Sequence, residues 1–203
     1  MRVKVCGITS VDDALACVDA GADALGLNFW PRSVRRCAEG EARRIVEAVG
    51  ERARLVAVVV DAPEPAVARL REAVGIRWIQ LHGDEPPEAL ARWLPEAYKA
   101  VRPASAADVD AARAWGGEEL LVDARVPGAP GGTGVVADWD LARSLARERR
   151  VWLAGGLHPD NVAEAVRRVD PYGVDVASGV ESAPGVKDRA AVRRFVERAR
   201  AAA

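Results

Sequence analysis

Apolar residues along this chain gather in eight short runs, and polar, helix-forming stretches separate the runs. The runs are rich in Val, Ile, Leu and Ala and cover residues 3–6, 24–29, 55–60, 76–81, 98–101, 120–123, 151–154 and 174–177. As a set they are continuously apolar and not alternating, which is typical of strands that are covered on both faces. Each run therefore predicts a buried β-strand.

A helix is expected after each of these strands. The first begins at Ser10, because a serine side chain caps a helix, and Asp12 and Asp13 suit the positive end of the helix dipole. Gly21 ends this helix. Seven further helices are expected near residues 41–49, 64–74, 86–93, 105–115, 138–148, 159–168 and 188–200.

Eight strand–helix units in succession favour a parallel sheet. With one unit per ~25 residues there is little room for insertions, so the chain is predicted to form a single-domain (β/α)8 TIM barrel over residues 1–203. A doubly wound open sheet is the main alternative. It is disfavoured because no Gly-x-Gly-x-x-Gly motif follows the first strand, and the glycines gather after the sixth, seventh and eighth strands instead.

The charge balance argues against polyanionic partners. Twenty-nine basic and thirty acidic residues give a formal net charge of −1, so neither nucleic acid nor a membrane surface is an expected partner. No apolar run approaches the ~20 residues of a membrane span, and the chain enters its first strand without a signal-peptide pattern, so we expect a cytoplasmic protein. Among the basic residues only Lys4, Lys99 and Lys187 are lysines, a bias that suggests no function by itself.

Three cysteines, Cys6, Cys17 and Cys37, are an odd number and lack the Cys-x-x-Cys spacing. A disulfide framework and a structural zinc site are therefore not expected. Any cysteine with a role should act as a thiol. Cys17 falls in the first predicted helix and Cys37 in a loop, and neither position suggests a function.

Glycine pairs follow the last two predicted strands. In a parallel barrel the chemistry lies at the carboxyl ends of the strands, and the loops after strands seven and eight often hold a phosphate. Glycine there lets backbone N–H groups approach the anion. Gly155 with Gly156, and Ser178 with Gly179, fit this need, although paired glycines also make ordinary tight turns. Their occurrence in two adjacent loops favours a phosphate site.

Cys6 and Asp123 end the first and sixth predicted strands and are the candidate acid–base pair. Taken singly, a cysteine at a strand end is often a small buried hydrophobe, and an aspartate often caps a loop. Together they are expected on two sides of one pocket. Proton transfer near neutral pH would require a lowered cysteine pKa and a raised aspartate pKa.

Three further polar residues lie at or near strand ends, each with an alternative explanation. Gln80 and His82 either line the pocket or serve packing and loop hydrogen bonds. Asp175 either orients the phosphate loop or the catalytic groups, or it caps a loop.

The sequence resembles phosphoribosylanthranilate isomerases, barrel enzymes of tryptophan biosynthesis, over essentially its whole length. Each motif is weak alone, but seven in the right order are specific. The motifs are Lys4–Thr9, Gly21–Gly26, Pro31–Arg35, Gln80–Gly83, Gly131–Gly134, Gly155–Val162 and Val174–Glu181, and Lys187–Asp188 continues the similarity. One departure is Ala137, where the family commonly has an aromatic residue before Asp138 and Trp139; it concerns the packing of the loop over the site.

The resemblance implies a division of roles. Carried over by position, Cys6 is the general base, Asp123 the general acid, and Arg35 binds the anthranilate carboxylate. The two glycine loops hold the phosphate. The implied reaction is the Amadori rearrangement of N-(5-phosphoribosyl)anthranilate to 1-(2-carboxyphenylamino)-1-deoxyribulose 5-phosphate. It implies no metal and no organic cofactor, in keeping with a chain whose only histidines are His82 and His158.

Two other functions compete with this interpretation. One is another isomerase or epimerase on the same phosphate-binding barrel that acts on a different sugar phosphate. The metal-using epimerases of that class would need His and Asp ligands on several strand ends, which two histidines supply poorly. A catalytically silent barrel that binds a phosphorylated ligand or a partner enzyme would have no need of both Cys6 and Asp123. The expected partner is a small phosphorylated substrate, and the chain is expected as a monomer or a homodimer.

Overall fold

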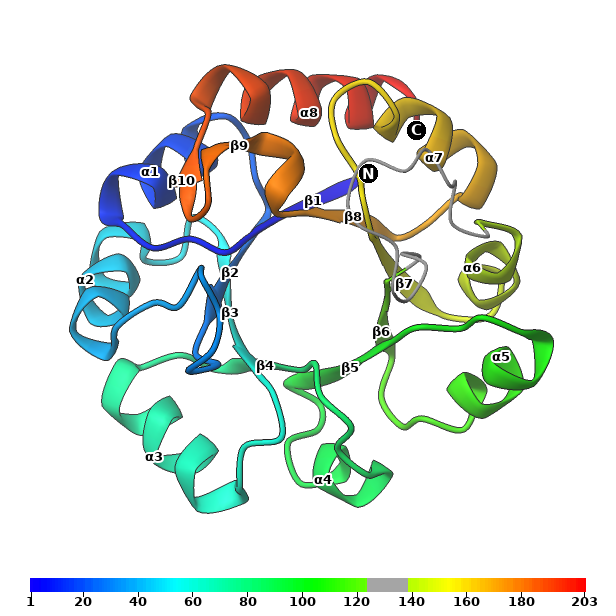
Figure 1. Ribbon diagram of the computed structural model, residues 1–203, viewed down its shortest axis with the longest axis horizontal. Coiled ribbons are helices and arrows are strands. Elements are labelled where there is room, and N and C mark those ends of the chain that lie inside the picture. The colour runs from blue at the N-terminus through cyan, green and yellow to red at the C-terminus, as the bar shows by residue number, and fades with distance from the viewer. Residues whose placement is uncertain (124–138) are drawn as a thin grey trace.

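A computed structural model describes residues 1–123 and 139–203 of the chain. Eight parallel strands close into a barrel in sequence order, with β1 paired to β8, which confirms the predicted (β/α)8 TIM barrel (Figure 1). The strands are β1 (Arg2–Cys6), β2 (Ala24–Asn28), β3 (Arg54–Val59), β4 (Trp78–Leu81), β5 (Ala97–Val101), β6 (Glu119–Asp123), β7 (Arg150–Ala154) and β8 (Gly173–Val176).

Helices surround the barrel as an outer ring (Figure 1). They are α1 (Val11–Asp19), α2 (Glu39–Val49), α3 (Glu64–Val74), α4 (Pro87–Ala91), α5 (Ala106–Arg113), α6 (Trp139–Ala146), α7 (Val162–Val169) and α8 (Arg189–Ala201). As predicted, the Ser10 side chain caps α1 by accepting a hydrogen bond from the Asp13 N–H. None of the helices in the described ranges has the length and apolar character that a bilayer span needs.

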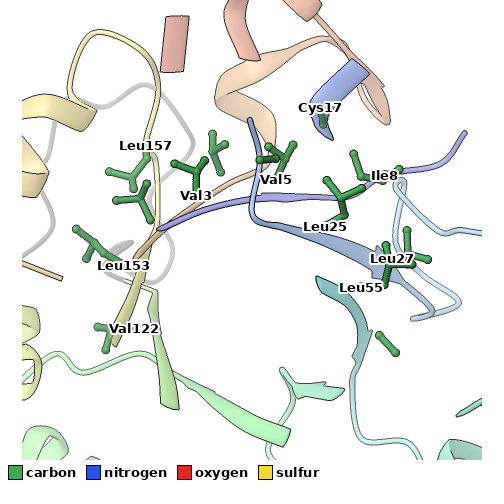
Figure 2. Close-up of a cluster of buried hydrophobic side chains, with 14 of the residues drawn as sticks. Val3, Val5, Ile8, Cys17, Leu25, Leu27, Leu55, Val122, Leu153 and Leu157 are labelled. Atoms are coloured by element: carbon green, nitrogen blue, oxygen red, sulfur yellow. The ribbon is translucent and has the colours of Figure 1, made fainter. Parts of the chain in front are cut away.

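Within each strand, alternate side chains enter two different hydrophobic layers. Val3 and Val5 of β1 belong to the large cluster between strands and helices, which also contains Cys17 of α1 (Figure 2). A smaller cluster, with Tyr98, Leu121 and Trp152 among its members, comes from the opposite strand faces. This inner layer fills the barrel. The runs that appear continuously apolar in sequence are therefore divided between an outer and an inner layer.

The inner positions near the carboxyl end of the barrel carry the polar side chains. Lys4 and Cys6 alternate with the outward Val3 and Val5 along β1. In the same way Gln80 lies between two outward residues of β4, Asp123 follows one at the end of β6, and Asp175 lies between two on β8. Since side chains alternate along a strand, these residues all face the barrel interior.

Several element boundaries differ from the predicted ones by one or two residues. The clearest case is β4, which begins at Trp78 and not at Ile76. Gly75 adopts the left-handed conformation at the end of α3, and the N–H of Ile76 still bonds to Arg71 of that helix. Ile76 is buried as part of the helix-ending turn, so its apolar character does not mark the start of the strand.

Three short elements after β8 were not predicted. They are a 3₁₀ turn, η1 (Ser178–Val180), and the antiparallel strands β9 (Glu181–Ala183) and β10 (Val186–Lys187). In Figure 1 this hairpin lies beside α1. Mostly exposed strands of two or three residues have no apolar run, so the sequence pattern offers no signal for them.

Candidate active site

The carboxyl ends of the barrel strands surround a cavity of about 630 Å³. Its wall contains all but one of the site residues expected from the sequence, namely Cys6, Arg35, Gln80, His82, Asp123, Gly155, Gly156, Asp175 and Ser178. The remaining one, Gly179, follows Ser178 in η1. The tertiary structure thus brings together residues from strands that are far apart in the chain. The glycine run 131–134 and Ala137 lie outside the described residues.

Cys6 ends β1, and its sulfur packs against the neighbouring strand. Gly26 of β2 is paired with Cys6, and a Cβ at position 26 would lie 2.7 Å from Sγ, so glycine there makes room for the thiol. Burial raises the pKa of Cys6 above its ordinary value, while the ammonium of Lys4 lowers it; the charge of Asp175 raises it, and Lys187 lowers it. A thiolate at this position therefore depends on the nearby ammonium groups.

Asp123 ends β6 and reaches the same cavity from another part of the wall. Its closest described cation is Arg102, which follows β5 and places Nε 3.8 Å from Asp123 Oδ2. The Arg102 side chain also donates to the carbonyl of His82 at 3.2 Å. Arg102 therefore connects the ends of β4 and β5 to the carboxylate on β6.

The guanidinium of Arg35, in the loop after β2, is held by Glu181. Arg35 Nε lies 2.8 Å from Glu181 Oε1, and Nη2 lies 2.7 Å from Oε2. Lys187 Nζ also donates to Glu181, at 2.7 Å. Burial opposes the ionised form of Glu181, but hydrogen bonds from Arg35 and Lys187 outweigh it and hold the pKa of this carboxyl below its usual range. The hairpin after β8 thus fixes the orientation of Arg35 at the cavity edge.

Gln80 and His82 form a hydrogen-bonded series with Tyr98. The Tyr98 hydroxyl donates to Gln80 Oε1 at 3.1 Å, and Gln80 Nε2 lies 2.7 Å from His82 Nδ1. If the amide donates, Nδ1 accepts and the proton of the neutral imidazole is on Nε2. Burial and the charge of Arg102 lower the pKa of His82 to about 3, so the imidazole is neutral near pH 7. The neutral ring on the cavity wall can donate a hydrogen bond without adding charge.

Asp175 faces the cavity from β8 and forms a buried ion pair with Lys4. The register of the barrel closure pairs the two residues across β1 and β8, and Lys4 Nζ lies 3.0 Å from Asp175 Oδ2. The Lys4 side chain is fully buried, and that of Asp175 is 8% exposed. The carboxylate is a residue that the sequence pattern indicates, whereas its lysine partner is not.

The two glycine loops lie against each other beside the cavity. Gly155 and Gly156 have φ values of 95° and 65°, a conformation that glycine adopts readily. A Cβ at Gly179 would overlap the carbonyl oxygen of Leu157 and lie 3.0 Å from the Cα of His158. The absence of a side chain at Gly179 therefore permits the close approach of the two loops.

This contact predicts a selective effect of Gly179→Ala. One loop must move to relieve the overlap, which disturbs the backbone groups that would bind phosphate. We therefore expect the inhibition constant of inorganic phosphate to rise by about tenfold, which corresponds to a small overpacking cost. Gly40→Ala is the matched control, because Gly40 is exposed on α2 and a Cβ there would meet nothing within 4 Å. Equal phosphate inhibition constants in both variants would contradict the proposed phosphate position.

Four site residues were missed in the sequence: Lys4, Arg102, Glu181 and Lys187. A signal for two of them was present. All three lysines of the chain are buried, at 0%, 4% and 5% exposure for Lys4, Lys99 and Lys187, whereas arginine supplies the other basic positions. In this arginine-rich chain a lysine indicates a buried ammonium group, whether it lies in an apolar run, as Lys4 does, or outside one, as Lys187 does. Nothing comparable distinguishes Arg102 or Glu181.

Metal-ligating side chains do not gather in the described part of the chain. Across residues 1–123 and 139–203, no three His, Cys, Asp or Glu side chains are grouped so that they could hold one metal ion together. Two ionic groups of the described part of the cavity wall, Asp175 and Arg35, are paired with Lys4 and Glu181.

Comparison with known proteins gives one consistent family. Residues 3–198 match the family model for N-(5'-phosphoribosyl)anthranilate (PRA) isomerase. A curated relative from Myxococcus xanthus, an N-(5'-phosphoribosyl)anthranilate isomerase, is 47% identical over 98% of this chain and 96% of its own length.

Two solved structures agree with that match. The phosphoribosyl anthranilate isomerase of Thermotoga maritima superposes with a TM-score of 0.91 at 36% identity, covering 99% of both chains. A phosphoribosyl anthranilate isomerase in complex with reduced 1-(o-carboxyphenylamino)-1-deoxyribulose 5-phosphate gives a TM-score of 0.87 at 34% identity, again over 99% of both chains. Sequence and fold agree over nearly the whole length, and this chain belongs to the phosphoribosylanthranilate isomerase family of enzymes.

Proposed function

We propose that this protein catalyses the Amadori rearrangement of N-(5-phosphoribosyl)anthranilate to 1-(2-carboxyphenylamino)-1-deoxyribulose 5-phosphate in tryptophan biosynthesis, with Cys6 and Asp123 as base and acid. The observation that carries the proposal is the position of these two residues. The thiol and the carboxylate reach one cavity from β1 and β6, and the two glycine loops border the same cavity. Family membership supports the reaction.

The first step assigned to the site is acid catalysis. Asp123 protonates the furanose ring oxygen, the C1–O bond breaks, and the anthranilate nitrogen supplies the electrons that make the protonated Schiff base. The acid leaves this step as a carboxylate. Arg102, with Nε 3.8 Å from Asp123 Oδ2, stabilises the negative charge that forms.

The second step assigned to the site is base catalysis. Cys6, as the thiolate, takes the proton from C2, and the electron pair of the C–H bond moves toward the protonated imine to give an enolamine. The enolamine then ketonises to the product. The protonated imine acts as the electron sink, so the substrate itself stabilises the carbanion.

The two anionic ends of the substrate have separate places in this proposal. The phosphate lies at the loops of Gly155, Gly156 and Gly179, where backbone groups can approach it. The anthranilate carboxylate lies at Arg35. Because Glu181 binds the Nε and Nη2 side of this guanidinium, the Nη1 side is the one directed to the substrate.

Arg35→Lys is expected to raise KM for the substrate by about tenfold or more, because an ammonium keeps the charge but cannot bind Glu181 and a substrate carboxylate with one planar fork. The inhibition constant of inorganic phosphate should stay within twofold of the native value. Arg36→Lys, an exposed neighbour in the same loop, is the control. Loss of phosphate inhibition in Arg35→Lys with unchanged KM would reverse the placement of the two ends.

A direct assay tests the proposed function. Purified protein is mixed with freshly prepared phosphoribosylanthranilate in the presence of a chelator, and the decrease of substrate fluorescence is followed while the product is identified by mass spectrometry. We expect turnover that Cys6→Ala and Asp123→Asn each abolish nearly completely. Substrate loss equal to the spontaneous rate without protein would refute the proposal, and activity restored only by added divalent metal would refute the acid–base mechanism.

A further inference from the structure

Lys4 is a buried cation whose charge is met, within the described part of the barrel, by the carboxylate of Asp175. Within the described ranges, neither Lys4 Nζ nor Asp175 Oδ1 has a hydrogen-bond partner of good geometry, although Lys4 Nζ lies 3.0 Å from Asp175 Oδ2. Buried ammonium groups are costly, and such pairs often contribute nothing to stability compared with apolar residues of similar size. Structural stability alone therefore does not explain why β1 carries a lysine among inward-facing residues.

The neighbour of Lys4 on the inner face of β1 is Cys6. The two residues are separated by one position, so both side chains point into the barrel. Lys4 is fully buried and Cys6 is half-buried at the cavity wall, and charges interact more strongly there than at an open surface. The Lys4 ammonium therefore lies where it can act on the Cys6 sulfur.

We propose that Lys4 is a positioning residue for catalysis: its buried ammonium stabilises the Cys6 thiolate, and Asp175 holds the ammonium in place from the adjacent strand. This role rests on the proposed function, in which the thiolate is the base. Strand β8 then contributes Asp175 to the site in addition to the phosphate loop that follows it. The buried ion pair between Lys4 and Asp175 becomes part of the site.

The electrostatics of the three groups agree in direction. Burial opposes the thiolate, and among the charges that act on Cys6 the effect of Lys4, which lowers its pKa, is larger than that of Asp175, which raises it. Burial also disfavours the charged form of Lys4, but the carboxylate of Asp175 and the thiolate of Cys6 raise the pKa of Lys4 above its usual value. The lysine thus remains protonated on the same strand face as a thiol that needs a cation.

The test measures the Cys6 thiol without substrate. Iodoacetamide alkylation is followed against pH in a Cys17→Ala/Cys37→Ala background, with the modified peptide identified by mass spectrometry. This background leaves Cys6 as the one cysteine of the sequence, so the alkylation rate reports on that thiol alone. We expect Lys4→Met to slow alkylation of Cys6 at pH 7 by about tenfold and to shift its pH midpoint upward.

Two further variants separate charge from packing. Asp175→Asn should slow alkylation of Cys6 less than Lys4→Met does, because the Lys4 ammonium is still present although the carboxylate that holds it is gone. The double variant Lys4→Met/Asp175→Asn leaves neither member of the pair buried alone, so it carries the test if Lys4→Met does not fold. It should still be slower than the native protein, since the effect of Lys4 is the larger one.

Lys99→Met is the matched control. Lys99 is also a buried lysine with a carboxylate partner, Glu85, at 2.7 Å, but its charge is not among those that shift Cys6. Its alkylation profile should equal that of the background protein. The proposal would be overturned if Lys99→Met or Asp175→Asn slowed alkylation of Cys6 as much as Lys4→Met does. It would also be overturned if folded Lys4→Met or the double variant had the same alkylation profile as the background protein.

The activity measurement distinguishes this inference from the proposed function. With Lys4→Met, the acidic limb of the kcat/KM profile should move to higher pH, with partial recovery of activity above the new midpoint. If Lys4→Met shifts the alkylation profile while Cys6→Ala remains fully active, the effect of Lys4 on the Cys6 thiol stands. The assignment of Cys6 as the base is then refuted.

Discussion

Cys6→Ala is expected to lower kcat by about a hundredfold or more, the usual scale for removing a general base, with a smaller change in KM. Cys6→Ser should be nearly as inactive. A serine hydroxyl is a much weaker acid than a thiol, so the ammonium of Lys4 cannot make it a ready base at neutral pH. Steady-state kinetics over pH 5–9 measure the effect, and thermal unfolding checks that each variant is folded.

Cys17→Ala is the control for the cysteine series. Cys17 is fully buried in the outer layer, on α1, and should affect stability more than kcat. For the native enzyme kcat/KM should rise with pH as Cys6 loses its proton, because only the thiolate accepts the C2 proton. Near-native kcat in Cys6→Ala, or a native acidic limb in the same variant, would remove Cys6 from the mechanism.

The second large effect is expected for Asp123→Asn, which should lower kcat by about a hundredfold or more because the amide cannot supply the proton that opens the ring. The substitution is nearly isosteric, so substrate affinity should change little. With a substrate analogue whose furanose ring is already open, Asp123→Asn should lower kcat less than it does with the normal substrate, since the step that needs the acid is bypassed.

Asp110→Asn, on the exposed face of α5, is the control and should keep native kinetics. Single-turnover measurements separate ring opening from the later proton transfer. A kcat for Asp123→Asn within threefold of native would assign the acid role to another group on the cavity wall.

Short-range patterns in the sequence account for the elements of this fold. Buried strands need apolar residues, helices need caps, and both requirements are local, as Ser10 and its bond to Asp13 illustrate. Eight such units in a row lead to the barrel. The hairpin of β9 and β10 could not be predicted because its short and mostly exposed strands are held by tertiary contacts, such as the bond from Thr9 Oγ1 to the Gly185 carbonyl at 2.6 Å.

The candidate site was predictable to the extent that it follows from strand ends. Cys6 and Asp123 end apolar runs, and the carboxyl ends of barrel strands meet at one face, so their approach to a common cavity was expected. The charge pairs of the site could not be predicted from the sequence. Arg35 and Glu181 are 146 positions apart, and Lys4 meets Asp175 only because β1 pairs with β8 when the barrel closes.

The sequence by itself determined the order of strands and helices, the strand ends that carry chemistry, and the glycines of the two loops, because each depends on a residue and its near neighbours. Only the tertiary structure decided which inward side chains share a charge environment. Coulomb interaction and desolvation depend on distance and burial in space and not on separation along the chain. The pKa of Cys6 is therefore a property of the closed barrel, set by burial together with Lys4, Asp175 and Lys187.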